Sequence, residues 1–366
     1  NPFARRSNHL AVRQLLNLGD FSRVDHRMHN KSMVIDNRVA IVGGRNLADE
    51  YFGLHTEVNF RDLEVLLGGT MVPTISQAFD GYWNDDWSFP IDQVTHVDSS
   101  PARLHQASLA AHQSSGLHQE LPRAELQSSW AAAIQSAYAG ESRLLVDTPP
   151  DDNPANTDQA PVQVADALMN ELSRAASEII IVSAYLIPTP ELESAVREAV
   201  ERGVSVKILT NSIGSNNHLS AHSAYRNHIN TLLGHGADLF EVRIDADDRS
   251  WYMLTPVEQK ELALHAKVLI IDDSKVFIGS ANLDPRSLRI NTEMGLVIDS
   301  RELNQALRQA VERDFDGKNA WNLKLTDAGT VNWVSSDGTL TAAPARSTLQ
   351  RLEDWFLSHL PIENEM

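Results

Sequence analysis

The chain has 366 residues, and its 42% hydrophobic content is enough for two ordinary domains with sizeable cores. A formal net charge of −18 argues against a general nucleic-acid binder, because such binding depends largely on phosphate neutralisation by Lys and Arg, although a small cationic pocket stays compatible with it. The lack of cysteine excludes disulfides, thiol catalysis and thiolate metal sites, and no run of about 18 apolar residues predicts a membrane-spanning helix.

The segment before residue 29 combines a predicted helix with a basic character. Apolar residues at helical spacing predict a helix over residues 8–18, and Gly19 and Asp20 end it. The arginines of this segment indicate either a rim that attracts phosphate headgroups or a solvated loop. They are Arg5, Arg6, Arg23 and Arg27.

The next stretch, from His29 to Asn46, is the first that is rich in chemical groups. His29 and Lys31 are two residues apart on a predicted strand, so their side chains project from the same face. Asp36 follows as a turn residue, Gly43 permits a tight turn or the close approach of a ligand, and Asn46 adds a hydrogen-bond donor. A general acid, base or nucleophile therefore lies beside a fixed positive charge.

A further strand and helix follow, and then a less regular segment. Residues 58–67 predict one strand that carries Asp62, and the helix after it has apolar residues at helical spacing, namely Phe79, Tyr82 and Trp83. Residues 90–141 are rich in Ser, Gln, His and Ala, which predicts a surface linker with one helix over residues 125–138. The histidines of this linker have no regular ligand spacing, so we predict no metal there.

From residue 142 onward, strands and helices alternate. Thr189 suits a helix N-cap, Pro190 suits the first helical position, and Gly203 suits the end. This alternation predicts an α/β fold with right-handed crossovers and a mixed, largely parallel sheet that helices cover on both faces. Strands are expected at residues 142–147, 178–186, 204–210 and 237–243, and helices at 162–176, 189–203 and 218–233.

Several polar residues fall where such sheets bind ligands. In open α/β sheets, ligands gather at the carboxyl ends of the strands, and Tyr185, Asn211 and Ser212 occupy two of these ends. We therefore take these three residues as candidates for a pocket.

The helix expected at 218–233 carries a second group of candidates. His222, Tyr225 and Arg226 either line the approach to the site or belong to an ordinary helix surface. His218 and His222 are four residues apart, which is metal-ligand geometry, but no third ligand is evident nearby. We predict no metal site.

The stretch from residue 265 to residue 282 repeats the earlier one. Matches of both identity and spacing at five positions are very hard to obtain by chance, so the second His/Lys pair argues against a purely structural role. The matched residues, each 236 positions after its counterpart, are His265, Lys267, Asp272, Gly279 and Asn282.

The two copies are similar but not identical. Ser280 can add a donor to the second copy, whereas Gly44 stands in its place in the first, and Arg45 stands where the second copy has Ala281. After the second copy, Glu293 lies near the start of a strand predicted over residues 290–298. A helix follows with Leu303, Leu307 and Phe315 at helical spacing. Residues 321–366 predict short β pieces and a final helix over 348–359, which we interpret as a packing extension without chemistry.

Two copies of His-x-Lys-x4-Asp-x6-Gly-(Gly/Ser)-x-Asn resemble the signature of the phospholipase D superfamily. The resemblance covers both motifs and most of the chain between and after them. The segments that follow the first motif, residues 46–53 and 60–65, look more particularly like bacterial cardiolipin synthases. The resemblance implies two halves related by a pseudo-dyad, with one active site at their interface and no cofactor.

The repeat also predicts how the chain is divided. We expect the end of a first half at 1–89, a linker at 90–141, a second half at 142–320 and an extension at 321–366. In the second half, 87 residues separate the first strand, at 178, from His265, whereas 28 residues precede His29. We therefore expect a longer natural protein, with 59 residues of matching structure and any targeting segment upstream.

Similarity to the family implies roles for the motif residues. His29 attacks phosphorus to give a phosphohistidine, and His265 protonates the leaving alcohol and then deprotonates the acceptor, although these two roles could be exchanged. Asp62 and Glu293 hold the imidazoles in the correct tautomer. Lys31, Lys267, Asn46 and Asn282 hold the non-bridging oxygens, whereas Asp36, Asp272, Gly43, Gly279 and Ser280 are structural parts of the motif.

The acceptor decides which reaction follows. A lipid hydroxyl gives a phosphatidyltransferase that makes cardiolipin, and water gives a phospholipase D or another phosphodiesterase. The acidic chain disfavours a nuclease, and the presence of both His/Lys pairs disfavours an inactive scaffold. The expected partners are phosphatidylglycerol, with phosphatidylethanolamine as a second candidate, and a membrane surface. The protein is then peripheral on a bacterial inner membrane, on its cytoplasmic or periplasmic face.

Overall fold

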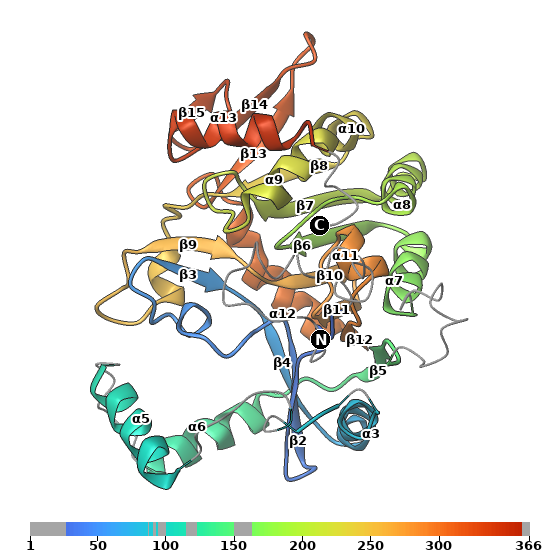
Figure 1. Ribbon diagram of the computed structural model, residues 1–366. Coiled ribbons are helices and arrows are strands. Elements are labelled where there is room, and N and C mark those ends of the chain that lie inside the picture. Colours follow the sequence, from blue (N-terminus) through green and yellow to red (C-terminus); the bar gives the residue numbers. More distant parts are fainter. Residues whose placement is uncertain are drawn as a thin grey trace.

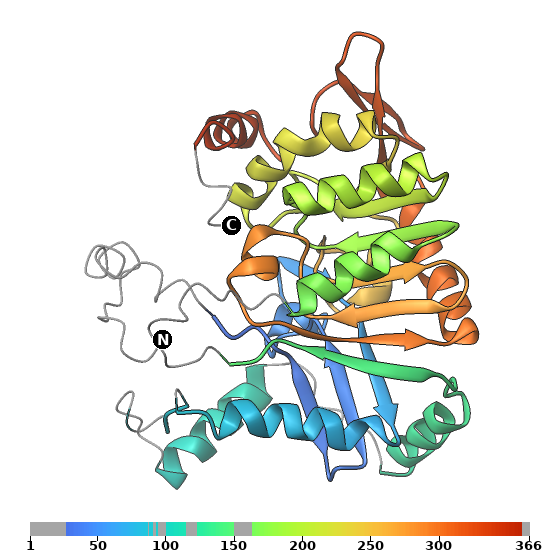
Figure 2. The same ribbon diagram turned by 90° about the vertical axis from the view of Figure 1, so that its right-hand side faces the viewer.

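The computed structural model describes residues 27–86, 88–90, 93, 100–114, 123–149 and 163–360. The helix predicted over residues 8–18 lies outside the described residues, as do Arg5, Arg6 and Arg23. Figures 1 and 2 show a large central sheet with helices on its faces, a smaller sheet below it, and two helices at one end.

The central sheet has ten strands and is mixed. Its β6–β7 and β7–β8 pairs are parallel, and its seven other neighbouring pairs are antiparallel. The expected mixed sheet is confirmed, but the expectation that it is largely parallel is wrong, because the strands of the second motif form antiparallel hairpins. In order across the sheet, the strands are β15 (Gly338–Leu340), β14 (Val331–Ser335), β13 (Ala320–Leu325), β8 (Asp238–Val242), β7 (Ser205–Asn211), β6 (Glu178–Ser183), β10 (Lys267–Ile271), β11 (Lys275–Gly279), β12 (Met294–Asp299) and β5 (Glu141–Val146).

Helices of the second half cover one face of this sheet (Figure 2). The helix expected at 218–233 is broken, because a 3-10 turn, η3 (Arg226–His228), separates α9 from α10. Thr189 caps its helix as predicted, since its side chain accepts a hydrogen bond from the backbone of Leu192. The helices on this face are α7 (Gln163–Arg174), α8 (Pro190–Glu201), α9 (Leu219–Tyr225) and α10 (Ile229–Gly234).

Alternate residues of β10 enter two separate cores, as a strand buried on both faces requires. Leu269 and Ile271 pack toward α7 and α8. Val268 and Ile270 pack on the opposite face, where α12 (Arg301–Glu312) lies beside a sheet of the first half. The second motif is therefore held from both sides.

The first half forms a smaller unit against that second face. Its sheet has the order β1 (Ser32–Ile35), β2 (Val39–Gly43) and β4 (Glu64–Gly68), and α3 (Met71–Trp83) follows. The strand expected over 58–67 is in fact two strands, which break at Asp62. The earlier piece, β3 (Val58–Arg61), leaves this sheet and pairs in parallel with β9 (Glu261–Leu264). This pairing joins the two halves directly.

Two helices of the linker, α5 (Pro101–Ser114) and α6 (Arg123–Gln135), lie away from the central sheet in Figure 1. The sequence predicted α6 but not α5. The boundary expected at 320/321 is wrong, because β13 begins at Ala320 and extends the central sheet by pairing with β8. A final helix, α13 (Thr348–Leu357), follows β15. Among the described residues, no helix has the length and apolar character needed to cross a bilayer.

Candidate functional site

Matching backbone contacts bring the two motif copies together. His265 follows β9 and donates its backbone N–H to the carbonyl oxygen of Arg61 at 2.7 Å. In the same way, Met28 forms a parallel bridge with Thr292, and the backbone N–H of His29 donates to the carbonyl oxygen of Thr292 at 2.9 Å. Each histidine is therefore tied to the residue just before a carboxylate of the opposite copy.

Each imidazole is bound by the carboxylate of the opposite copy. His265 Nδ1 lies 2.7 Å from Asp62 Oδ2, and His29 Nδ1 lies 2.9 Å from both oxygens of Glu293. Both carboxylates are fully buried. Because an ionised carboxylate only accepts hydrogen bonds, each Nδ1 carries the proton, and the lone pair of each Nε2 is left available. The sequence predicted these two carboxylates, but not that they are exchanged between the copies.

Burial keeps both imidazoles neutral near pH 7. It lowers the pKa of His265 to about 4, with a further contribution from Lys267, although Asp62 opposes the shift. Burial also lowers the pKa of His29, and the hydrogen bond to Glu293 opposes this change. A neutral imidazole can act as a nucleophile or as a base.

The two lysines hold equivalent positions beside the imidazoles. Lys31 Nζ donates to the carbonyl oxygen of His29 at 2.9 Å, and Lys267 Nζ donates to that of His265. Burial lowers the pKa of Lys31 to about 7, with Lys267 as the second cause, and lowers the pKa of Lys267 to about 8. Lys267 Nζ also lies 3.0 Å from His265 Nδ1, but that nitrogen donates its proton to Asp62. Lys267 is buried, Lys31 is partly buried, and the charge of Lys267 acts on Lys31, so the pair favours the binding of an anion between them.

The two motif asparagines differ in their partners. Asn46 Nδ2 donates to the hydroxyl oxygen of Tyr51 at 2.7 Å. The side-chain oxygen of Asn282 is buried and has no partner in the part of the chain that the structure describes. An unpaired buried acceptor is costly, which makes Asn282 suited to accept a hydrogen bond from a bound hydroxyl group.

The difference between Gly44 and Ser280 has a steric reason. The Ser280 hydroxyl donates to Glu293 Oε2, and so supports the carboxylate that binds His29. A Cβ at Gly44 would come within 2.8 Å of Asp62 Oδ1 and 3.1 Å of Lys267 Cδ. Glycine is therefore required there so that Asp62 can reach the opposite copy.

Gly43 and Gly279 permit close approach of neighbouring strands. A Cβ at Gly43 would meet the carbonyl oxygen of Leu63 at 2.7 Å, and one at Gly279 would meet the carbonyl oxygen of Met294 at 2.5 Å. Contacts this short to backbone atoms cannot be relieved by a side-chain rotation. These geometries agree with the structural role expected for both glycines.

The turn aspartates also have structural geometry. Asp272 Oδ1 accepts hydrogen bonds from the backbone N–H groups of Ala176, Ser177 and Glu178, at 3.1, 2.7 and 3.2 Å. It thereby fastens the β10–β11 turn to the start of β6. Asp36 occupies the equivalent turn but is exposed.

Sequence reasoning missed two residues of the site. Asp147 supports Glu293 because its carboxylate accepts the backbone N–H of Glu293 at 2.8 Å and that of Val164 at 2.9 Å. Burial raises the pKa of Asp147 to about 6. The other missed residue is Tyr51, whose hydroxyl lies 3.3 Å from His265 Nε2. Its position inside the family-like segment 46–53 was the available signal, whereas Asp147 had none beyond its place at the end of a strand.

Two of the three candidates at strand ends are structural. The side-chain nitrogen of Asn211 donates to the carbonyl oxygens of Ala184 and Leu264, and its side-chain oxygen accepts a hydrogen bond from the backbone N–H of Leu264. The Ser212 hydroxyl donates to the carbonyl oxygen of Val242. Only Tyr185, which donates to Asn217 at 2.6 Å and lies partly exposed, keeps a position suited to a pocket.

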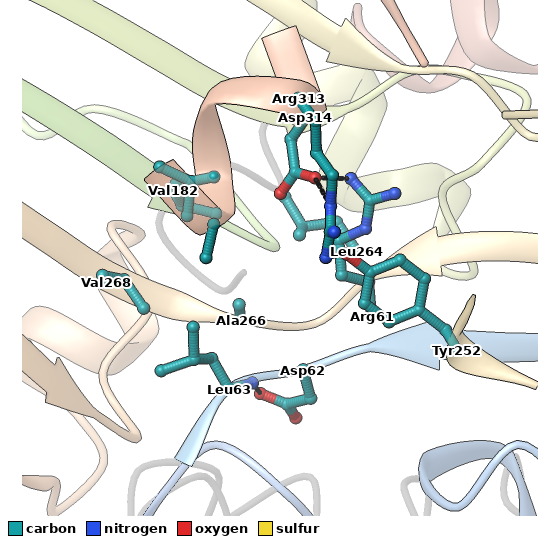
Figure 3. A pocket seen from close by; sticks show the side chains of 12 residues that line it. Arg61, Asp62, Leu63, Val182, Tyr252, Leu264, Ala266, Val268, Arg313 and Asp314 are labelled. Atoms are coloured by element: carbon teal, nitrogen blue, oxygen red, sulfur yellow. Dashed lines mark hydrogen bonds and ion pairs between the residues drawn. The ribbon is translucent and has the colours of Figure 1, made fainter. Parts of the chain in front are cut away.

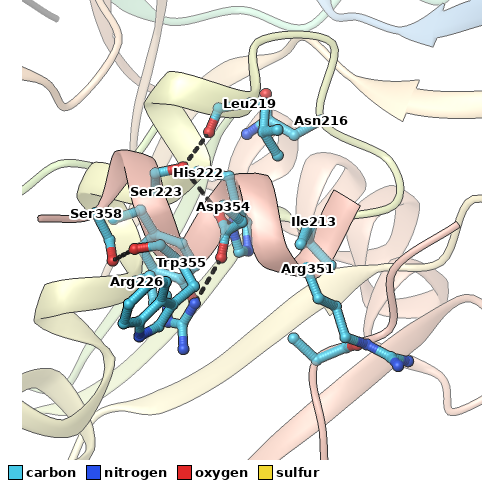
Figure 4. A network of polar contacts seen from close by, with 12 residues as sticks. Ile213, Asn216, Leu219, His222, Ser223, Arg226, Arg351, Asp354, Trp355 and Ser358 are labelled. Atoms are coloured by element: carbon cyan, nitrogen blue, oxygen red, sulfur yellow. Dashed lines mark hydrogen bonds and ion pairs between the residues drawn. The ribbon is translucent and has the colours of Figure 1, made fainter. Parts of the chain in front are cut away.

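The helical candidates do not line the approach to the site. His222 is buried and binds Asp354 of α13 at 2.7 Å, and Arg226 binds the same carboxylate at 3.0 Å (Figure 4). Tyr225 is buried too, and its hydroxyl lies 3.2 Å from Glu241. The contacts with Asp354 fasten the C-terminal helix, and the contact of Tyr225 with Glu241 holds α9 against β8, so the pocket role predicted for His222 and Tyr225 is wrong. Within the described residues, no group of three or more His, Asp or Glu side chains could hold a metal ion.

A cavity of about 120 Å³ lies beside the first copy's carboxylate (Figure 3). Asp62 lines it together with apolar side chains, among them Val182 and Val268. Arg61 also lines it and is held there by Asp248 and Asp314, at 2.6 and 2.7 Å. These contacts fix the strand end that carries Asp62.

Known proteins share this sequence and fold. Residues 168–315 match the family described as cardiolipin synthase, PLD-like domain. The chain is 33% identical to cardiolipin synthase C of Escherichia coli (strain K12) over 375 residues, which covers 99% of this chain and 77% of that protein. Cardiolipin synthase B of Salmonella typhi is 28% identical over 300 residues, covering 81% and 57% of the two chains. The crystal structure of phosphatidylserine synthase from Haemophilus influenzae Rd KW20 matches with a TM-score of 0.50 and 15% identity, over 80% of this chain and 62% of that one.

The fold and the paired His/Lys motifs define an enzyme of the phospholipase D type. Its two imidazoles, two ammonium groups and exchanged carboxylates fit the transfer of a phosphodiester group. The extent of the match to the Escherichia coli protein makes the assignment narrower. The chain belongs to the cardiolipin synthase family of the phospholipase D superfamily.

Proposed function

We propose that this chain transfers a phosphatidyl group from phosphatidylglycerol to the hydroxyl group of a second phospholipid and so forms cardiolipin. The observation that carries the proposal is that the histidine of each motif copy is bound by a carboxylate of the other copy, because this arrangement makes one site from the two motifs. Similarity to the cardiolipin synthases supports the lipid substrates.

In the first step, His29 attacks the phosphorus atom and the glycerol headgroup leaves. Glu293 keeps the proton on His29 Nδ1, so that Nε2 is the nucleophile. His265 gives a proton to the leaving oxygen. Its low pKa in the free protein rises when a phosphodiester anion binds beside it, since nearby negative charge favours the protonated ring.

In the second step, the acceptor hydroxyl gives its proton to His265 Nε2 and attacks the phosphohistidine. The phosphorus–nitrogen bond breaks, which restores neutral His29 and releases the product. Lys31 and Lys267 bind the non-bridging oxygens throughout and offset the charge that builds up on them. Asn46 and Asn282 add hydrogen bonds to the same group.

Exposed apolar side chains beside the site support a substrate that lies in a bilayer. Leu47 and Phe52, on the loop that carries Tyr51, are 94% and 46% exposed, and Trp251 and Leu254 are 71% and 47% exposed. The backbone of Leu254 donates to Gly53 at 2.8 Å, so the two loops form one rim. We propose that this rim, defined by Leu47, Phe52, Trp251 and Leu254, inserts into the lipid surface. The protein is then peripheral on an inner membrane.

The activity is tested by incubating the protein with phosphatidylglycerol vesicles, with and without phosphatidylethanolamine, and analysing the lipids. Cardiolipin is the expected product. Phosphatidic acid alone would assign a hydrolase instead, and cleavage of DNA in a parallel assay would assign a nuclease.

The rim is tested by vesicle sedimentation of the Leu47→Ser/Trp251→Ser double variant. We expect binding to be weaker by at least roughly 30-fold, since each of the two inserted side chains stabilises the bound state by roughly 1–2 kcal/mol and every 1.4 kcal/mol is a factor of ten. The binding should persist at high salt, because a chain of net charge −18 gains little electrostatic attraction to anionic lipid. Leu349→Ser/Trp355→Ser, a pair on α13 that is also exposed, is the matched control. Weaker binding of the control pair instead would move the docking surface to α13.

A further inference from the structure

Tyr51 reaches from the first copy to the histidine of the second. It ends η1 (Asp49–Tyr51), the short turn after the first motif, and is 9% exposed. Its hydroxyl lies 3.3 Å from His265 Nε2, and its ring meets the imidazole edge-on with the ring centres 4.8 Å apart. Phe60 packs against both rings, with its centre 4.8 Å from that of Tyr51 and 5.4 Å from that of His265. The phenol is thus held against the one imidazole nitrogen that Asp62 leaves unbound.

The direction of this hydrogen bond follows from the partners. Asp62 fixes the proton of His265 on Nδ1, so Nε2 is an acceptor and the Tyr51 hydroxyl is the donor. Asn46 Nδ2 in turn donates to the Tyr51 oxygen at 2.7 Å. Burial raises the pKa of Tyr51 above its usual value, so the phenol keeps its proton. Each donor and acceptor is therefore assigned along the series of hydrogen bonds that runs from Asn46 through Tyr51 and His265 to Asp62.

The proposed reaction needs this same nitrogen. His265 Nε2 gives a proton to the leaving alcohol and later accepts one from the incoming alcohol, so an alcohol oxygen must lie where the Tyr51 hydroxyl lies now. A single lone pair accepts one good hydrogen bond. The phenol and the substrate alcohol consequently compete for the same position.

We propose that Tyr51 selects the acceptor: its hydroxyl covers His265 Nε2 once the first alcohol has left, and it yields that position to a lipid hydroxyl but not to water. The inference rests on the proposed function. A lipid acceptor brings binding energy from the rest of its headgroup, which can displace the phenol, whereas a water molecule brings only its own hydrogen bonds.

The two fates of the intermediate define what Tyr51 controls. In transfer, the lipid O–H bond breaks, its proton goes to His265, and its oxygen replaces His29 on phosphorus to give cardiolipin. In hydrolysis, water takes the same course and the product is phosphatidic acid. Both fates release neutral His29, so they differ only in which hydroxyl reaches His265 Nε2.

Asn46 couples this displacement to phosphate binding. Its amide nitrogen donates to Tyr51 in the present arrangement, although the motif predicts that it binds a non-bridging oxygen of the substrate. When the phenol moves away, Asn46 Nδ2 becomes free to donate to the phosphate. A correctly bound lipid therefore stabilises the displaced position of Tyr51.

The experiment compares Tyr51→Phe with the wild-type protein on phosphatidylglycerol vesicles and measures the ratio of phosphatidic acid to cardiolipin. Phenylalanine keeps the ring that packs on Phe60 and removes only the hydroxyl. The matched control is Tyr252→Phe, because the half-buried Tyr252 has a hydroxyl that contacts Arg313, at 3.2 Å, and not His265.

We expect the ratio to rise at least severalfold in Tyr51→Phe and to stay at the wild-type value in Tyr252→Phe. The pH profile of kcat/KM gives a second readout. The phenol donates to neutral Nε2 and so favours the neutral ring, which means that its loss shifts the His265 limb to higher pH. Asp62, Lys267 and Lys31, the other charged groups that act on this ring, are unchanged in the variant.

Other outcomes would overturn the inference. Equal losses of both products, with an unchanged ratio and pH profile, would mean that Tyr51 has only a packing role. A lower ratio would mean that Tyr51 activates water rather than excluding it. If the wild-type protein makes neither lipid, the proposed function itself fails, and this result is distinct from an unchanged ratio in an active protein.

Discussion

The two motif copies share the same residues but are supported differently. Asp36 and Asp272 have nearly the same backbone conformation, with φ of 52° and 51°. Asp272 fastens its turn to the start of β6, whereas no hydrogen-bond partner of the Asp36 side chain is found in the residues that the structure describes. The first copy is held instead through contacts with the second, by β3 on β9 and by Glu293 on His29. The site thus depends on the joint between the copies more than on either sheet.

The largest expected effect separates the roles of the two histidines. His29→Ala should abolish turnover of every substrate, because it removes the nucleophile. His265→Ala should slow turnover of phosphatidylglycerol by roughly 10²–10⁴-fold, as expected for loss of a general acid. It should slow the cleavage of a p-nitrophenyl phosphodiester much less, since that leaving group needs no proton. Rate measurements on both substrates check this, and the opposite pattern would exchange the two roles.

The exchanged carboxylates should have the next largest effect. Asp62→Asn and Glu293→Gln keep shape but remove the charge that fixes each imidazole tautomer. We expect a loss of about 10³-fold in kcat for either variant, in the range of a misoriented catalytic histidine. Circular dichroism and kinetics together measure this. A loss confined to one carboxylate would show that the two copies do not contribute equally.

The pH dependence of kcat/KM should be bell-shaped. Activity should rise on the acid side as the nucleophile His29 loses its proton, below the ordinary histidine value because burial lowers its pKa. It should fall on the alkaline side as Lys31 and Lys267, with pKa values of about 7 and 8, lose the charge that binds phosphate. Lys31→Arg should move the alkaline limb upward, because arginine stays charged. An alkaline limb that does not move would exclude Lys31 as its source.

The smallest effect concerns stability and compares the two turns. Asp272→Ala removes three hydrogen bonds to backbone N–H groups and should lower the free energy of unfolding by about 2–4 kcal/mol. Asp36→Ala should lower it by less than about 1 kcal/mol, in line with an exposed side chain. Urea titrations measure both values. Equal losses would show that Asp36 has a partner equivalent to that of Asp272.

The sequence predicted which residues meet at the site better than it predicted the joint between the copies. The repeat identified both His/Lys pairs, because matching residue types at matching spacing require no knowledge of distant contacts. Asp62 and Glu293 lie outside the fixed offset and were expected from the strand that follows each copy and from the family resemblance. The repeat could not show the break between β3 and β4 at Asp62, since residues 58–67 are apolar enough for one strand. Pairing with β9, which is some 200 residues away in the chain, decides that break.

The errors at His222 and Tyr225 have a similar cause. Their position on a helix beside a strand end suggested access to the site. In the structure, His222 binds Asp354 and Tyr225 binds Glu241, so both side chains point into buried polar contacts. Asp354 comes from the C-terminal helix, and no sequence pattern places that helix beside α9. Polar residues on helices could thus be assigned only after the partners from the end of the chain were known.

The exchange of carboxylates is tested most directly by nuclear magnetic resonance of the imidazole Nδ1 protons, with nitrogen-15-labelled histidine. We predict that Asp62→Asn shifts the signal of His265 alone and that Glu293→Gln shifts the signal of His29 alone. A shift of the His29 signal in Asp62→Asn, with that of His265 unchanged, would place each carboxylate on the histidine of its own copy and would contradict the account.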